Sequence, residues 1–372
     1  MKAGVESLLV LALSIRNFRN LAQADFRPSP RFNVFSGDNG QGKTNVLEAL
    51  YAVLSSKSFR TSKVADLMPH TEPGGVAEVV SVRAKVREGD MTREQRFAVD
   101  QGTRSVRIDD KRPRSLLAYA TASPVVVFHP GELSLSTGPS AERRKLLDRV
   151  ALFVAPTGIS ELEAYTRAQR SRQKTLEARG IDATDVDHWE TLVIQHGLAL
   201  MEARAAAAER IVSRALVAFE SIFTTPLGCE ISYVPGAPRE AEAFRAELRK
   251  NRALDLRRGT ARIGPHRDDL ALSLKGAAAR TSASQGQHRA LVLALKAAEI
   301  AVIGEARGAR PVLLLDDVSS ELDRARTEAL FSFLRATEGQ VFLTTTRPEL
   351  IATEGAERAD FQLRQGVISP LS

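Results

Sequence analysis

The sequence predicts an α/β fold in which a sheet is divided into two halves by an inserted α-helical lobe. Near the start, short runs with strand periodicity lead into a glycine-rich loop and then into a helix. Between about residues 141 and 259 the composition shifts to Ala, Glu, Arg and Leu, which favour long helices. Helices and strands alternate again from Leu291 onward, a pattern typical of parallel sheets. We therefore expect a head of residues 1–140 and 260–372 and a helical insertion of residues 141–259.

The first half of the head begins with strands. Leu9 to Ile15 alternate in the strand manner, and short strands are predicted at 24–26 and 32–35. The last of these runs into the glycine-rich loop, and residues 45–55 follow with helical spacing. Period-two alternation then returns over residues 76–113, so we expect a mixed sheet accompanied by an antiparallel β subdomain.

The insertion and the second half of the head follow from the same periodicities. Gly180 and Pro226 should interrupt the helices of the insertion, which shows no heptad sustained over many turns. Further on, PVLLLDD and QVFLTTT indicate buried strands, with a helix predicted between them in RTEALFSFLRA.

Composition restricts the class of protein. The net charge of +7 and the pI near 9.7 favour a polyanionic partner, whereas 5% aromatic residues disfavour a single-strand stacking platform. The single cysteine, Cys229, excludes an intramolecular disulfide framework and fits a reducing cytoplasm. No cleavable signal or membrane span is evident, so we expect a soluble, cytoplasmic protein with no membrane partner.

The glycine-rich loop matches the phosphate-binding pattern G-x-x-x-x-G-K-[ST] between a predicted strand and helix. Its glycines let backbone N–H groups curl around phosphates. Lys43 should reach the β and γ phosphates of ATP, and Thr44 should hold Mg²⁺. The predicted ATP-binding residues are Gly37, Asp38, Asn39, Gly40, Gln41, Gly42, Lys43 and Thr44.

Two carboxylates follow the predicted buried strand 312–315. Ligands bind at the carboxyl ends of strands in such sheets. We expect Asp316 to join Thr44 at the Mg²⁺ ion and Asp317 to orient or deprotonate the attacking water, so that Lys43 and Asp317 are the predicted catalytic pair.

A second anion site is predicted where Ser284, Gln285, Gly286 and Gln287 open a helix. A chain that already has one phosphate loop has no evident use for another in cis. The economical interpretation is action in trans, on the γ-phosphate held by a second copy. Ser320, Glu321 and Asp323 would then lie at the same dimer seam.

The phosphate loop, SQGQ, the acidic strand and SELD resemble, in this order, the ABC-type P-loop ATPase heads of the ATP-binding cassette superfamily. Within its SMC-like branch the sequence is similar to the RecF family of bacterial DNA replication and repair proteins. The similarity rests on these motifs: IRNFRNL, GDNGQGKTNVLEALY, KSFR, VFHPGE, ERRKLLD, GPHRDD, SQGQHR and LLLDDVSSELD.

The resemblance implies an ATP-dependent homodimer that binds duplex and gapped DNA and helps to load RecA together with RecO and RecR. It also implies a weak, DNA-stimulated ATPase whose slow hydrolysis releases the protein. The chain departs from the wider superfamily at three points. Asp317 stands in place of a catalytic glutamate, Thr344–Thr346 in place of a switch histidine, and His129–Glu132 in place of the glutamine loop.

Several assignments stay open in the sequence. For DNA contact we expect Lys57, Arg60 and Lys63, with Arg143 and Arg144 as further candidates, although surface ion pairs explain each nearly as well. The alternatives to this function are a transporter ATPase subunit, a metabolic P-loop kinase and a structural SMC protein.

His266 has two interpretations of equal weight. It lies in the turn-like GPHRDD segment and either couples the site to the insertion or satisfies a turn hydrogen bond.

Overall fold

The computed structural model describes residues 6–69, 79–222, 227–317, 334, 335, 337, 339–351, 353 and 355–371. The chain divides into two compact units, each with its own core. The first comprises Met1–Glu132 and Ile303–Ser372, and the second comprises Leu133–Val302. The second unit thus extends beyond the predicted insertion on both sides.

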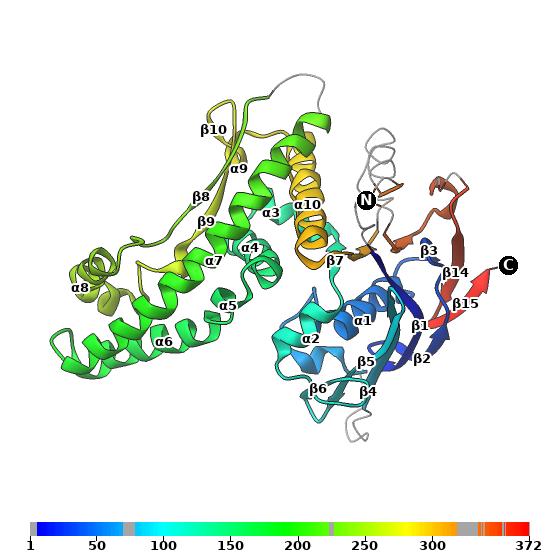
Figure 1. Cartoon of the computed structure of the whole chain (residues 1–372), viewed down its shortest axis with the longest axis horizontal. Coiled ribbons are helices and arrows are strands. Elements are labelled where there is room, and N and C mark those ends of the chain that lie inside the picture. Colours follow the sequence, from blue (N-terminus) through cyan, green and yellow to red (C-terminus); the bar gives the residue numbers. More distant parts are fainter. Residues whose placement is uncertain are drawn as a thin grey trace. The chain divides into compact units, whose positions relative to one another are not determined.

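The first unit contains two sheets (Figure 1). Its strands are β1 (Glu6–Phe18), β2 (Leu21–Phe26), β3 (Phe32–Ser36), β4 (Val80–Glu88), β5 (Met91–Asp100), β6 (Thr103–Ile108), β7 (Val125–Phe128), β11 (Ala309–Arg310), β12 (Val312–Leu315), β13 (Val341–Thr345), β14 (Arg358–Arg364) and β15 (Val367–Leu371). Its helical segments include α1 (Lys43–Ser55), η1 (Val64–Leu67), α2 (Leu116–Ala122) and η4 (Pro348–Leu350), and η2 (Pro130–Leu133) leads out of it.

The two sheets differ in strand direction. One has the order β11-β1-β4-β5-β6, with β2 beside β1, and its pairs are antiparallel except for β1 with β11. The other has the order β15-β14-β3-β13-β12-β7 and is parallel except for the β14–β15 hairpin. This confirms the predicted combination of a mixed sheet with antiparallel strands, and places the carboxyl ends of β3, β12 and β13 along one edge.

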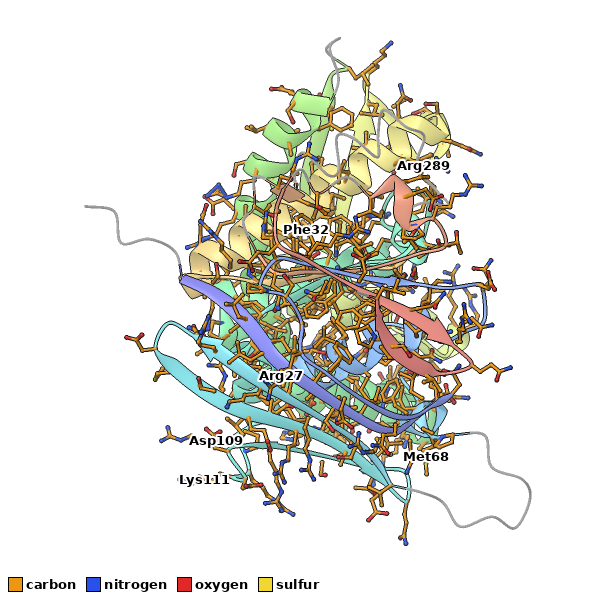
Figure 2. The ribbon with its side chains drawn as sticks, turned by 90° about the vertical axis from the view of Figure 1, so that its right-hand side faces the viewer. Arg27, Phe32, Met68, Asp109, Lys111 and Arg289 are labelled. Atoms are coloured by element: carbon orange, nitrogen blue, oxygen red, sulfur yellow. The ribbon has the colours of Figure 1, made fainter. Side chains whose placement is uncertain are left out.

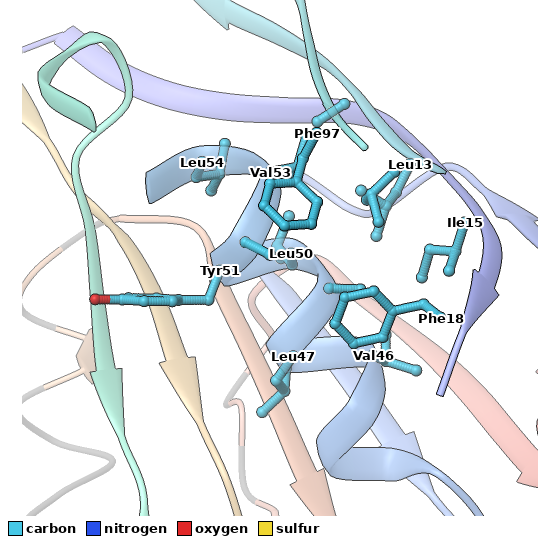
Figure 3. Packing of buried hydrophobic residues seen from close by; sticks show 14 of the residues in the cluster. Leu13, Ile15, Phe18, Val46, Leu47, Leu50, Tyr51, Val53, Leu54 and Phe97 are labelled. Carbon is cyan, nitrogen blue, oxygen red and sulfur yellow. The ribbon is translucent and has the colours of Figure 1, made fainter. Parts of the chain in front are cut away.

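The core of the first unit is built around α1. Its apolar residues include Val46, Leu50 and Val53, which are fully buried and pack in one cluster with Phe18 and Phe97 (Figure 3). Figure 2 shows the contrast between Phe32, deep in the unit, and Lys111, which projects from the turn after β6. Burying side chains of this size stabilises the fold by about 1.5–3 kcal/mol each, so α1 is a rigid support for the loop that precedes it.

The second unit is mainly helical. Its elements are α3 (Ser134–Thr137), α4 (Ser140–Val154), α5 (Pro156–Ile159), α6 (Leu162–Arg179), α7 (Thr184–Ile222), β8 (Cys229–Val234), α8 (Ala241–Arg258), η3 (Pro265–Arg267), β9 (Asp269–Leu274), β10 (Ala277–Ala278), α9 (Ala279–Ser282) and α10 (Gln285–Arg307), whose last residues belong to the first unit. The α6 helix ends at Gly180, as predicted, whereas Pro226 lies outside the described residues. Among the helices that the structure describes, none combines the length and the apolarity that crossing a membrane requires.

Candidate nucleotide site

The phosphate loop joins the carboxyl end of β3 to the first turn of α1. Gly42 is the N-cap of α1 and has φ 104°, a left-handed conformation that residues with a Cβ rarely adopt. A Cβ at this position would lie 2.7 Å from Asn20 Oδ1, so any other residue would also have to displace the Asn20 side chain. No acidic residue lies in the first turn of α1, and the partial positive charge of the helix N-terminus therefore faces the loop without a competing carboxylate from that turn.

Lys43, the first residue of α1, folds back over the loop. Its Nζ donates to the carbonyl oxygens of Gly37 at 2.7 Å and Asp38 at 2.8 Å. Burial lowers the pKa of Lys43, and the charges of Asp317, Asp316 and Asp38 oppose this shift. The Lys43 ammonium is thus held against the loop by two hydrogen bonds to backbone carbonyls, which phosphate oxygens could replace.

The acidic end of β12 meets the phosphate loop directly. Thr44 Oγ1 donates to Asp316 and lies 2.8 Å from Oδ1 and 3.0 Å from Oδ2. The Asp316 amide is fixed by a 2.8 Å bond to the carbonyl of Phe128, the last residue of the neighbouring β7. A hydroxyl and a carboxylate in contact are the hard oxygen donors that Mg²⁺ prefers, so this pair fits the ion.

Thr344, on β13, connects the two acidic residues. Its hydroxyl donates to Asp316 Oδ1 at 2.8 Å and accepts from the backbone N–H of Asp317 at 2.8 Å. Thr344 is fully buried, and Asp317 has a left-handed backbone with φ 51°. In the sequence, residues 344–346 stand in place of a switch histidine, and the structure brings the hydroxyl of Thr344 to the acidic pair.

A buried glutamate lies behind the loop on α1. Glu48 is fully buried and accepts from Arg19 through Nε at 2.6 Å and Nη2 at 2.8 Å, and from Ser58 Oγ at 2.5 Å. Arg60 also reaches Glu48 at 3.2 Å and Asn45 Oδ1 at 2.9 Å. Sequence reasoning missed this cluster, for which the available signal was one charged residue inside the apolar run NVLEALY.

The predicted DNA contacts fall into two groups. Lys57, Arg60 and Lys63 are exposed on the segment that follows α1. Arg143 is only 8% exposed and binds both Asp269 oxygens, at 2.7 and 2.9 Å. Arg144 donates to the Asp268 carbonyl at 2.7 Å and to Ser140 Oγ at 2.8 Å. Because these last two guanidinium groups hold the second unit together internally, they are poor candidates for phosphate contact.

The SQGQ motif begins α10 in the second unit. Ser284 Oγ accepts from the backbone N–H of Gln287 at 3.3 Å, and Gln287 Oε1 accepts from the backbone N–H of Ser284 at 2.8 Å. This reciprocal capping box fixes the start of the helix. In the next turn the buried His288 bonds through Nδ1 to Ser136 Oγ at 2.7 Å.

The remaining sequence candidates have simpler outcomes. His266 donates from Nε2 to the Ala261 carbonyl at 2.9 Å, so it does satisfy a hydrogen bond within its turn. Ser320, Glu321 and Asp323 lie outside the described residues, as does most of the helix predicted after the acidic strand.

Comparisons with known proteins agree with one another. The family model of the RecF/RecN/SMC N terminal domain matches residues 9–368. The chain is 39% identical to the DNA replication and repair protein RecF of Anaeromyxobacter sp. (strain Fw109-5), over 97% of this chain and 99% of that one. It is 36% identical to the RecF of Geobacter sp. (strain M21), over 96% of this chain and 99% of that one.

Solved structures give the same relationship. The recombination mediator protein RecF-ATP of the RecFOR pathway has a TM-score of 0.85 and 26% identity, covering 98% of this chain and 100% of that one. The RecF-ATPrS form has a TM-score of 0.87 and 26% identity, covering 99% of both chains. The Smc head domain from Pyrococcus furiosus, with a TM-score of 0.56 and 17% identity over 98% of this chain and 96% of that one, shares the fold.

Proposed function

The chain belongs to the RecF family of RecF/RecN/SMC proteins, and from this premise we propose that it is an ATP-dependent DNA-binding protein of DNA repair and replication. Nucleotide binding would switch the chain into a homodimer that holds duplex or gapped DNA. Slow, weakly DNA-stimulated hydrolysis would release it. RecO and RecR are the proposed partners in loading RecA, in keeping with the RecFOR pathway of the solved relatives.

The contact between Thr44 and Asp316 is the observation that carries this proposal. It joins the phosphate loop to an acidic strand end 272 residues away in the chain. In the proposed role, loop amides and Lys43 bind the ATP phosphates, while Thr44 and Asp316 hold Mg²⁺. The ion would supply charge neutralisation at the phosphate oxygens.

Asp317 is proposed to orient the attacking water. Its main chain is held by the Thr344 hydroxyl, and its charge acts on Lys43. A carboxylate at this position can accept a proton from water while Lys43 stabilises the phosphate oxygens.

The proposed dimer uses two different parts of each chain. The phosphate loop belongs to the first unit, whereas Ser284–Gln287 belong to the second. We propose that this helix start binds the γ-phosphate held by the other copy, because amides at a helix N-terminus attract anions.

The proposed DNA surface is the basic segment after α1. Lys57, Arg60 and Lys63 are exposed there. Arg60 reaches back to Asn45 and Glu48 on the first turns of α1, so the segment is tied to the nucleotide loop. Contacts from such basic side chains to the DNA phosphates carry little sequence information, which suits a protein that recognises DNA structure.

Duplex binding with and without nucleotide tests the proposal. We expect Mg-ATP to tighten duplex binding at least about tenfold, or about 1.4 kcal/mol, measured by fluorescence anisotropy at fixed salt. Lys43→Met should remove this gain because the phosphates lose their cation. Lys250→Met removes the same charge from an exposed position on α8 and should leave the gain intact.

Three results would contradict the proposal. Duplex affinity that is independent of nucleotide in the wild type would exclude ATP-gated binding. Phosphorylation of a small acceptor would favour the kinase alternative. Co-sedimentation with membranes would favour the transporter alternative.

A further inference from the structure

The phosphate loop accepts two hydrogen bonds from a turn that lies more than 300 residues later in the chain. The turn between β14 and β15 contains Gln365 and Gly366. The backbone N–H of Gln365 donates to the side-chain Oε1 of Gln41 at 2.5 Å. The backbone N–H of Gly366 donates to the backbone carbonyl of Gln41 at 3.1 Å. Gln41 and Gln365 are 324 positions apart in the chain, so the contact exists only in the folded first unit.

The sheet register explains how this turn reaches the loop. β14 lies parallel to β3, with Phe361 opposite Phe35 and Gln362 opposite Ser36. Both strands therefore end at the same edge of the sheet. The loop that follows β3 and the turn that follows β14 meet there.

Asn20, in the turn between β1 and β2, lies between the phosphate loop and the Gln365–Gly366 turn. Its Oδ1 accepts from Asn45 Nδ2 at 2.7 Å, and its side chain occupies the position that a Cβ on Gly42 would need. On its other side, a Cβ on Gly366 would overlap the backbone oxygen of Asn20. Gly366 also has φ 78°, so glycine is required both for the conformation and for the close approach.

We propose that Asn20 and the Gln365–Gly366 turn are positioning elements of the nucleotide site. They hold Gln41 and Gly42 in the shape that receives the phosphates, so that the loop is ordered before ATP arrives. Binding then costs less conformational entropy than closing a free loop would. This inference rests on the proposed ATP binding and assigns part of the ATP affinity to residues outside the phosphate-loop motif.

The chain contains a matched control for this idea. Gln101–Gly102, between β5 and β6, forms a second hairpin turn with closely similar φ angles. Gln101 has φ 46° and Gly102 φ 73°, against 47° and 78° for Gln365 and Gly366. A Cβ on Gly102 meets no atom within 4 Å. Gly102→Ala and Gly366→Ala therefore both place a Cβ on a left-handed backbone, and only the second affects the contact with Asn20.

The decisive experiment measures the Kd for Mg-ATP by displacement of a fluorescent ATP analogue, together with the melting temperature of the nucleotide-free protein. We expect Gly366→Ala to weaken binding about tenfold or more, and Gly102→Ala to bind as the wild type does. Gln41→Met keeps the length of the side chain but loses its acceptor. It should raise the KM for ATP about two- to tenfold.

A further variant separates backbone from side-chain effects. Gln365→Asn keeps the donating main-chain N–H and tolerates φ near 47°, so it should bind ATP as the wild type does. Equal affinities in the two alanine variants, or a lowered melting temperature with unchanged Kd and KM, would overturn the inference. If Gly366→Ala fails to fold, the KM of Gln41→Met decides the question. A wild type that binds no ATP would instead refute the proposed function itself.

Discussion

His266 illustrates how individual polar residues of the second unit are fixed. Its Nε2 donates to the Ala261 carbonyl, so Nδ1 carries no proton and accepts from the Tyr165 hydroxyl at 2.6 Å. Burial lowers the pKa of His266, assisted by the charges of Arg267 and Arg144 and opposed by that of Asp255. Burial also raises the pKa of Tyr165. The pair is therefore neutral and specifically oriented.

This arrangement predicts a loss of stability in mild acid. The folded pKa of His266 lies below its usual value of 6.5, so the unfolded chain takes up a proton first as the pH falls through that value. Stability should therefore decrease from pH 7.5 to 5.5. His288 should contribute in the same direction, since burial lowers its pKa too. Urea unfolding followed by circular dichroism at several pH values measures the effect.

A substitution assigns part of this pH dependence to one residue. His266→Gln keeps a donor for Ala261 but cannot titrate. The stability of this variant should therefore fall less steeply than that of the wild type as the pH decreases. His188→Gln, at an exposed position on α7, should keep the slope of the wild type. A slope in His266→Gln equal to that of the wild type would contradict the assignment.

At the scale of elements, three helices of the second unit are joined by a buried charge network. Arg172 on α6 donates to Glu190 on α7 at 3.0 Å and to Asp255 on α8 at 2.8 Å. All three side chains are almost completely buried. Arg252 adds a second cation, 2.6 Å from Glu190. The network fixes how the three helices align, and it leaves costly charges behind if one member is removed.

Removing Arg172 should therefore destabilise the second unit strongly. We expect Arg172→Met to lower the free energy of unfolding by about 3–5 kcal/mol, because Glu190 and Asp255 lose a buried partner. Arg179→Met is the matched control in the same helix, since Arg179 and its partner Asp185 are both exposed. Urea unfolding should show little change in that variant. Similar losses of unfolding free energy in Arg172→Met and Arg179→Met would contradict the proposed role of the buried network.

The comparison of sequence with structure is clearest for particular elements. The strands β4 to β6 were predictable because buried and exposed residues alternate along them. The strands β3, β12 and β13 were predictable as short apolar runs, and each is fully buried. The strand β8 was missed inside the predicted helical insertion. It is a short alternating run, CEISYV, whose partner β9 begins at Asp269, beyond the predicted border. Local composition cannot reveal such a pairing.

The candidate site was predictable to the extent that its chemistry is local. The spacing of Lys43 and Thr44 and the carboxylates after a buried strand were visible in the sequence. The roles of Asn20, Glu48 and Gly366 were not, because they depend on contacts between distant elements. Arg143 and Arg144 were further candidates for DNA contact, with ion pairs as the alternative, and composition could not identify their partners, Asp269 and the Asp268 carbonyl.

At the scale of the whole molecule, the two features that we propose to bind nucleotide lie in two separate units of each chain. The phosphate loop and the acidic strand end lie in the first unit, and the capped start of α10 lies in the second. In the proposed roles, each feature would offer backbone N–H groups at a helix start to an anion. In the proposed dimer, each copy would complete the nucleotide site of the other.

The molecular mass in solution tests this account most directly. Light scattering of the full chain should give 40.5 kDa without nucleotide and twice that mass with Mg-ATP. Lys43→Met and Ser284→Arg should both remain at 40.5 kDa, the first for lack of bound phosphate and the second because its capped helix start is blocked. A wild type that stays monomeric with bound ATP, or a Ser284→Arg variant that dimerises like the wild type, would contradict it.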